Sequence, residues 1–564
     1  MQLSIALVRL WNEWEIRLLV LLSFTLQLFL FFTGGLRRRS SNKLLRCSIW
    51  LAYLGADMIA FYTLGQISRL GDSMNSRDPV TGTMSLAFFW APFLLVHLGG
   101  QDTITAFSSE DNNLWLRHFL NLLVEVSLAL YVFWKSMGGN NQLLIPAMFV
   151  FVSGIIKYVE RIWALKYGSK DDLNSTTSNY ENNQLPPLSV EKDRYCDIVC
   201  YVIHTSRYIR GFLAGRATFQ MGHEIRFTLV DYFGRFADHG AKLKIIEMEL
   251  AIIYDDLYTK SVVFRTWTGS IFRCVVQIST VVAFVLFNAD RKESYSKVDV
   301  PITYVLLSGS ICMELVSILM AMVSPWAWAF LKARNFHWLT GMFWSVFNTV
   351  QPEKRSWWSN SIGQYNLVRS IFCNESLTIG IIRNMMSSIG FAKFWKHLRH
   401  TKDVNAKKKI MECVVQWLDK QDRFEDLARG MRPRLGTEFE LILRGPFEHA
   451  ILQLHLFTDY HITGLFDEGS PLHSTEGERS HVASICEEIS NYMIYLLVVN
   501  PSMLPVSTTA EDTLALFPEK VFSTSRGGFR EMSSLPLSTR KDHIREVLHS
   551  DWRAGEIEGK RNMD

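Results

Sequence analysis

The stretch "FFWAPFLLVHLGGQDTITAFSSEDNNLWLRH", residues Phe88–His118, joins an apolar, aromatic run to a dense group of polar side chains. Pro92 interrupts the run, Gly99 and Gly100 end it, and an amphipathic segment begins at Leu114. So abrupt a change from hydrocarbon-like to polar side chains is typical of the edge of a membrane. The stretch therefore predicts a buried helix, a turn at the membrane boundary and a second helix.

Similar apolar runs on both sides of this stretch predict an all-α, polytopic membrane protein with about seven transmembrane helices. The candidate spans are Leu18–Phe32, Ser48–Leu64, Met84–Leu98, Phe119–Trp134, Leu143–Ile156, Cys274–Phe287 and Ile302–Val323. A helix needs roughly 20 residues to cross the hydrocarbon, so the shorter runs must recruit flanking residues or re-enter. Glu13 and Glu15 precede the first run and Arg37–Arg39 follow it, which favours an uncleaved anchor over a signal peptide.

Basic residues near the spans predict the orientation, because Lys and Arg stay on the cytoplasmic side. They cluster after the first, fifth and seventh spans, at Arg37–Arg46, Lys157–Lys170 and Lys332–Arg334. This places the N-terminus on the non-cytosolic side and the C-terminus in the cytosol, in the plasma membrane or an endomembrane.

The distribution of apolar runs predicts five regions. They are a bundle of about five spans (1–157), a cytosolic helical insert (158–265), two further spans (266–325), a mainly helical cytosolic domain (326–525) and a polar, loosely ordered tail (526–564). The net charge of +4 and the absence of a long basic stripe argue against a nucleic-acid partner. Eight scattered cysteines form no disulfide framework and are expected to be reduced.

Three acids lie within the predicted spans: Asp57, Glu125 and Glu314. An ionisable side chain at membrane depth is costly and is a functional candidate by default. The acids either line a cation or proton route or are protonated and hydrogen-bonded to neighbouring helices, and we favour the second interpretation. No basic residue is expected at the same depth, although Arg273 lies near the start of the sixth span.

Two groups of residues are of the types that bind metal ions, and each also has a purely structural explanation. His97, Asp102, Glu110, Asp111 and His118 fall within the opening stretch, but Ser108 or Ser109 with Glu110 and Asp111 also fits the cap of a helix beginning near Asn112. Cys196, Cys200 and His204 are spaced at i, i+4 and i+8. Residues at this spacing move gradually around the helix over two turns, so all three are hard to bring to one tetrahedral metal ion, and a fourth ligand is missing. We favour the structural interpretation of both and expect no metal or other cofactor.

Catalytic signatures are absent from the sequence. His455 and Asp459 share a helix face and are able to pair, but no nucleophile elbow, P-loop, dinucleotide fingerprint or kinase signature accompanies them. We therefore predict no catalytic residues and a protein that is not an enzyme.

The opening stretch resembles the hallmark of a plant membrane-protein family, domain of unknown function 4220. A second block of that family is similar to "EMELAIIYDDLYTKS" (Glu247–Ser261), while "EHAILQLHLFTDYH" (Glu448–His461) and "ISNYMIYLLVVNPSMLP" (Ile489–Pro505) resemble its C-terminal partner, domain of unknown function 594. The first block directs attention to its motif residues, which are His97, Gly99, Gly100, Asp102, Glu110, Asp111 and Trp115. Full-length members continue into a Cys/His-containing segment, so this chain, ending in "HSDWRAGEIEGKRNMD", resembles a truncated or divergent member.

The resemblance implies a multi-span membrane protein and supplies no activity. We expect a lipid-embedded scaffold or signalling protein whose cytosolic helical domain binds a protein partner. The alternative is a cation or proton channel or transporter that uses the intramembrane acids, and a weaker alternative is a membrane-embedded enzyme.

Overall fold

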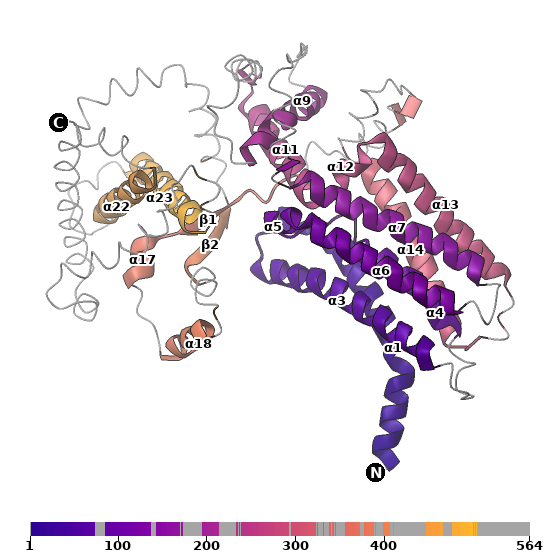
Figure 1. The fold of residues 1–564 in the computed structure, drawn as a ribbon. Helices are drawn as coiled ribbons and strands as arrows, with labels where there is room; N and C mark the ends of the chain where they lie inside the picture. Colours follow the sequence, from indigo (N-terminus) through magenta and orange to yellow (C-terminus); the bar gives the residue numbers. More distant parts are fainter. Residues whose placement is uncertain are drawn as a thin grey trace, which may run out of the picture. The chain divides into compact units, whose positions relative to one another are not determined.

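The computed structural model describes residues 2–73, 85–136, 143–169, 195–213, 238–290, 295–322, 356–372, 377–388, 399–405, 447–465 and 476–499, with isolated positions between them. The chain divides into two units, Met1–Ser359 and Asn360–Asp564, and each is described by itself (Figure 1).

The first unit contains a bundle in which seven long helices of the described part run alternately up and down (Figure 1). They are α1 (Gln2–Thr33), α3 (Lys43–Ser73), α4 (Ser85–Leu98), α6 (Trp115–Ser136), α7 (Leu144–Tyr167), α13 (Trp267–Ala289) and α14 (Asp299–Met322). Contacts fix the two ends: Arg17 of α1 pairs with Asp299 at the start of α14, whereas Ser317 near the end of α14 reaches the turn after α4. The end that carries this turn is called the polar end below.

Five helical segments of the described residues are long and apolar enough to cross a membrane, and the protein is an all-α membrane protein. They are Trp14–Arg39, Lys43–Arg69, Trp115–Trp134, Trp267–Ala289 and Asp299–Ala321. Of the other two predicted spans, one lies in α4, which at 14 residues is about 21 Å long. The other lies in α7, which continues past the expected boundary at residue 157 and includes Lys157, Glu160 and Arg161.

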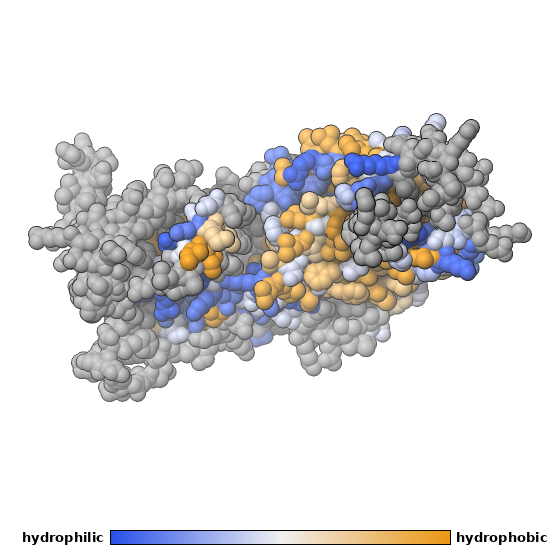
Figure 2. Space-filling view, turned by 90° about the horizontal axis from the view of Figure 1, so that it is seen from below, coloured by the Kyte–Doolittle hydropathy of each residue, from blue (hydrophilic) through white to orange (hydrophobic). Residues whose placement is uncertain are grey.

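Helix α4 is the core of the bundle because its side chains are apolar on every side. Its residues from Leu86 to Leu98 are buried, and α1, α3, α6, α7 and α14 pack around it. Trp90 is fully enclosed, and its indole N–H donates to Thr303 Oγ1 of α14 at 2.9 Å. The outer faces of α3 and α6 instead expose large apolar side chains, and Figure 2 shows hydrophobic residues gathered over the bundle on one face of the molecule.

Shorter helices lie at the polar end: α2 (Leu36–Arg39), α5 (Ser109–Asn113) and α12 (Ser261–Phe264). The predicted insert contains α9 (Tyr195–Leu213) and α11 (His239–Tyr258), which pack through a separate apolar cluster that includes Val199, Val202 and Ile245. Asp238 caps α11 by accepting hydrogen bonds from two backbone N–H groups.

Within its described residues, the second unit consists mainly of helices, with one short sheet. It contains α17 (Leu367–Phe372), α18 (Leu377–Ser388), α22 (Phe447–Leu465) and α23 (Glu476–Val499). The sequence did not indicate β1 (Ser361–Tyr365) and β2 (Thr401–Asn405), which pair antiparallel with Gly363 opposite Asp403. The predicted tail (526–564) lies outside the described residues.

Candidate functional site

The turn between α4 and α6, Gly99–Leu114, is called the polar turn. Gly100 has a φ of +68°, which favours glycine. A Cβ added to Gly99 would lie 2.7 Å from the Cβ of Lys157, so glycine is needed where the turn passes α7. The Gly-Gly pair thus lets the chain leave α4 sharply and stay close to α7.

The predicted cap lies in this turn. Ser108 is the N-cap of α5, and the Asp111 carboxylate accepts from the backbone N–H groups of Phe107 at 2.8 Å and Ser108 at 3.1 Å. The cap is therefore confirmed, although the helix begins at Ser109 rather than near Asn112, and a new helix, α6, begins at Trp115.

The polar turn also binds the corner between α11 and α12, Leu257–Lys260, which is called the insert corner. The side-chain amide of Asn112 donates to the Leu257 carbonyl at 2.9 Å. The Thr105 N–H donates to the Tyr258 carbonyl at 2.8 Å, and the Lys260 N–H donates to the Asp102 carbonyl at 3.2 Å. The two sequence blocks that carried the family resemblance in this half of the chain are therefore bonded to one another.

Lys260 places its ammonium in the interior of the polar end, where the residue is fully buried. The ammonium donates to the Lys157 carbonyl at 3.1 Å and the Gly100 carbonyl at 3.4 Å. Carboxylates of Glu160 and Asp102 lie 3.6 and 4.0 Å away. Burial lowers the pKa of Lys260, and the two carboxylates oppose that effect.

Lys260 belongs to a larger group of buried charges, called the charge cluster, whose members are Asp102, Lys157, Glu160, Lys260, Arg273 and Glu314. Arg273 donates to Asp102 at 2.6 Å, and its second nitrogen lies 3.3 Å from Glu314, which also pairs with Lys157. Burial alone would raise the pKa of Asp102, but Arg273 and Lys260 hold it well below its usual range. Three acids and three bases make the cluster formally neutral, as burial requires.

The arginines after α1 bind both the polar turn and the insert. Arg37 donates to the carbonyls of Ala106 and Phe107, and its guanidinium lies 3.8 Å from the centre of the Phe107 ring. Arg38 pairs with Asp255 of α11 at 2.5 Å. The basic residues that served as an orientation signal thus also hold α11 against the polar end.

Two of the three predicted intramembrane acids have basic partners. Arg161 of α7 binds Asp57 through both guanidinium nitrogens, at 2.8 and 2.7 Å, and Glu314 pairs with Lys157 and Arg273. The expectation that no base lies equally deep was wrong, because α7 carries Lys157 and Arg161 into the bundle interior. The preferred interpretation of Asp57 and Glu314 as protonated acids is replaced by ion pairing.

Glu125, the third acid, is different. It is buried on α6, and its Oε2 has no hydrogen-bond partner among the described residues. His118, on the same helix, is likewise buried with an unpartnered Nε2 in the described part of the chain.

The remaining motif residues lie apart from one another. His97 is buried with its Nδ1 2.9 Å from Ser23 Oγ, Glu110 is exposed, and Trp115 is half-buried with the Lys166 ammonium 5.2 Å from its ring centre. Within the described residues no group of three or more His, Cys, Asp or Glu side chains is placed to hold a metal ion. Cys200 is half-buried on α9, and the side chains of Cys196 and His204 lie outside the described residues.

His455 of the second unit does not bind Asp459, the partner that the helix spacing allows; Asp459 instead accepts from Asn366 at 2.8 Å. The Leu367 N–H donates to His455 Nε2 at 3.3 Å, and Ser490 Oγ lies 2.9 Å from Nδ1. Because Nε2 accepts, the neutral ring has its proton on Nδ1 and donates it to Ser490, so it is not a base for that hydroxyl. Burial lowers the pKa of His455 to about 4.

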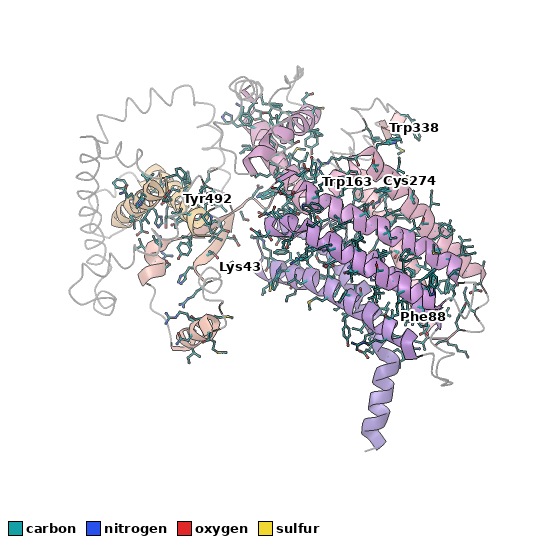
Figure 3. The ribbon with its side chains drawn as sticks, in the orientation of Figure 1. Lys43, Phe88, Trp163, Cys274, Trp338 and Tyr492 are labelled. Carbon is teal, nitrogen blue, oxygen red and sulfur yellow. The ribbon has the colours of Figure 1, made fainter. Side chains whose placement is uncertain are left out.

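Sequence reasoning missed Lys157, Arg161 and Lys260. The first two follow the fifth apolar run directly and read as interface residues, while Lys260 stands alone near the end of its block. The available signal was the excess of acids over bases in the predicted spans, since buried charges require partners. The charge cluster lies at the end of the bundle near which Trp163 of α7 and Cys274 of α13 are labelled in Figure 3.

Comparison with known proteins gives one family. A family model described as "Domain of unknown function (DUF4220)" matches residues 50–371, which span both the polar turn and the insert corner. No curated protein matches the chain, and no solved structure matches it.

Proposed function

The chain belongs to the DUF4220 family, and we propose that it is a non-enzymatic membrane scaffold or signalling protein that presents a rigidly held helical insert to a protein partner. The observation that carries the proposal is the binding of the insert corner by the polar turn through Lys260. A buried lysine with four oxygen neighbours holds one position, so the insert is fixed to the bundle rather than tethered flexibly.

The proposed orientation places the polar end and the insert in the cytosol and the N-terminus outside. Its support is that Arg37–Arg39, the basic end of α7 and Lys260 gather at one end of the bundle. We further propose a plant origin, a plasma-membrane or endomembrane location, and membership of Glu448–Pro505 in domain of unknown function 594, on the sequence resemblance alone.

Two observations support the scaffold over the alternatives. Ion pairs occupy Asp57 and Glu314, which weakens a cation route lined by all three acids. The His455 ring donates to Ser490 and is no base for it, which weakens the enzyme alternative.

Proximity labelling tests the proposal, with the labelling enzyme attached to the C-terminus of the full chain. Lys260→Met removes the buried ammonium, and Lys297→Met, at an exposed position, is the matched control. We expect the wild type and the control to label the same partner and Lys260→Met to lose most of that labelling at equal membrane abundance. No enriched partner in any variant contradicts the scaffold, and equal labelling by Lys260→Met contradicts the role of the insert corner.

A further inference from the structure

A line of polar side chains, called the polar file, lies between α3, α6 and α7. Its members are Tyr53 and Asp57 of α3, His118 and Glu125 of α6, and Tyr158 and Arg161 of α7. Tyr53 donates to the Thr105 carbonyl of the polar turn at 3.3 Å, which places one end of the file at the polar end. Arg161 binds Asp57 and also donates to the Leu98 carbonyl at 2.8 Å.

Glu125 lies near the middle of α6 (Trp115–Ser136). It lies ten residues after the start of α6 at Trp115, or roughly 15 Å along the helix axis. That distance is about half of a hydrocarbon core of roughly 30 Å. His118 lies two turns closer to the polar end on the same face of α6, so the file extends from the polar end toward mid-membrane.

The basic group of the polar file is already paired, so Glu125 has no countercharge within the file. Arg161 is already neutralised by Asp57 through two hydrogen bonds, and the other neighbour on α7, Tyr158, carries no positive charge. An ionised carboxylate at this depth would carry an uncompensated charge and a bare Oε2. Protonation removes the charge and lets the carboxyl group donate a hydrogen bond.

The groups that face Glu125 are Asp57 on α3 and Tyr158 and Arg161 on α7. Helix α4 also packs against α6, and its only titratable side chain, His97, lies against Ser23 of α1 instead. Asp57 keeps about a third of its side chain exposed, at 34%, and His118 has an unpartnered Nε2. These two polar groups lie between the polar end and Glu125.

We infer that Glu125 is a proton-binding site at the end of a polar file that extends from the polar end of the bundle. The site is separate from the insert corner, so the inference goes beyond the scaffold and stands or fails independently of it.

Infrared difference spectroscopy on the full chain in lipid bilayers tests the inference, together with a count of protons released on alkalinisation. Glu125→Gln keeps the shape but does not titrate, and Glu125→Asp retains a carboxyl. Glu110→Gln removes an exposed carboxyl and is the matched control. Circular dichroism compares the folding of all variants.

We expect the protonated-carboxyl band of the wild type to be lost in Glu125→Gln, with about one proton fewer released per chain. Glu125→Asp keeps a shifted band, and Glu110→Gln keeps the band unchanged. A band that persists in Glu125→Gln overturns the inference. So does a band that disappears equally in all three variants, because the signal then does not depend on a carboxyl at position 125.

Discussion

The Lys260 ammonium donates a hydrogen bond to the main-chain carbonyl of Lys157, 3.1 Å away and 103 positions earlier in the chain. This bond joins the insert corner to α7 at the point where Gly99 packs against Lys157. The amphipathic insert and the membrane bundle are consequently one unit, held by a buried charge as well as by apolar contacts.

Removing the Lys260 ammonium should destabilise the polar end strongly. Lys260→Met leaves Glu160 without the basic group nearest to it, and breaking a buried ion pair costs about 3–5 kcal/mol. Unfolding of the purified protein in detergent measures the loss. The exposed control, Lys297→Met, should change stability by less than about 0.5 kcal/mol. Equal stability of the two variants would mean that the ammonium makes no net contribution.

Asp57 and Arg161 should behave as a coupled pair. Asp57→Asn keeps the shape but removes the countercharge, so we expect a loss of about 1–2 kcal/mol after allowing for the partial exposure of Asp57. A double-mutant cycle with Arg161→Gln measures the coupling. Additive effects of the two substitutions would contradict the pairing.

The cap at Asp111 should contribute modestly to folding. Asp111→Ala removes the acceptor of two backbone N–H groups and should cost about 1 kcal/mol. Glu110→Ala, at an exposed neighbouring position, is the control and should cost less. Hydrogen exchange of residues 107–113 provides the readout, and equal exchange in both variants would show that the cap does not order this turn.

The second unit should lose stability as the pH falls from about 6.5 toward about 4. The pKa of His455 is lowered from 6.5 to about 4, so the folded state favours the neutral ring and protonation favours unfolding. The stabilisation is fully present above pH 6.5, and a lowering of this size corresponds to about 3 kcal/mol.

Hydrogen exchange of α22 and α23 in the full chain measures this pH dependence. His455→Gln should flatten it, whereas His449→Gln, at an exposed position, should not. A pH dependence that is the same in all three proteins would exclude His455 as its source.

Local patterns in the sequence predicted much of the first unit. The apolar run that ends at Leu98 indicated a buried helix, and α4 is buried on all sides. Ser108 and Asp111 stand at cap spacing, and the cap is present. Such features depend on neighbours within one or two turns, so they can be read without the fold.

The pairing of the buried charges could not be read in this way. Asp57 pairs with a residue 104 positions away, and Asp102 with one 171 positions away, so each partner depends on how the helices pack. The end of α7 was also misplaced, because Lys157 and Arg161 interrupt the apolar run while remaining inside the bundle. Strands β1 and β2 were missed because "SIGQY" and "TKDVN" are short and do not alternate clearly.

Disulfide cross-linking between the polar turn and the insert corner tests the central claim most directly. The Thr105 N–H bonds to the Tyr258 carbonyl at 2.8 Å, so the two backbones lie close enough for a disulfide. In native membranes, Thr105→Cys with Tyr258→Cys should form an intramolecular disulfide under mild oxidation, and mass spectrometry of the linked peptides separates it from native thiols. Thr105→Cys with Leu250→Cys, two turns away along α11, should not form one. Efficient thiol labelling of both introduced cysteines, without any disulfide between positions 105 and 258, would contradict the account.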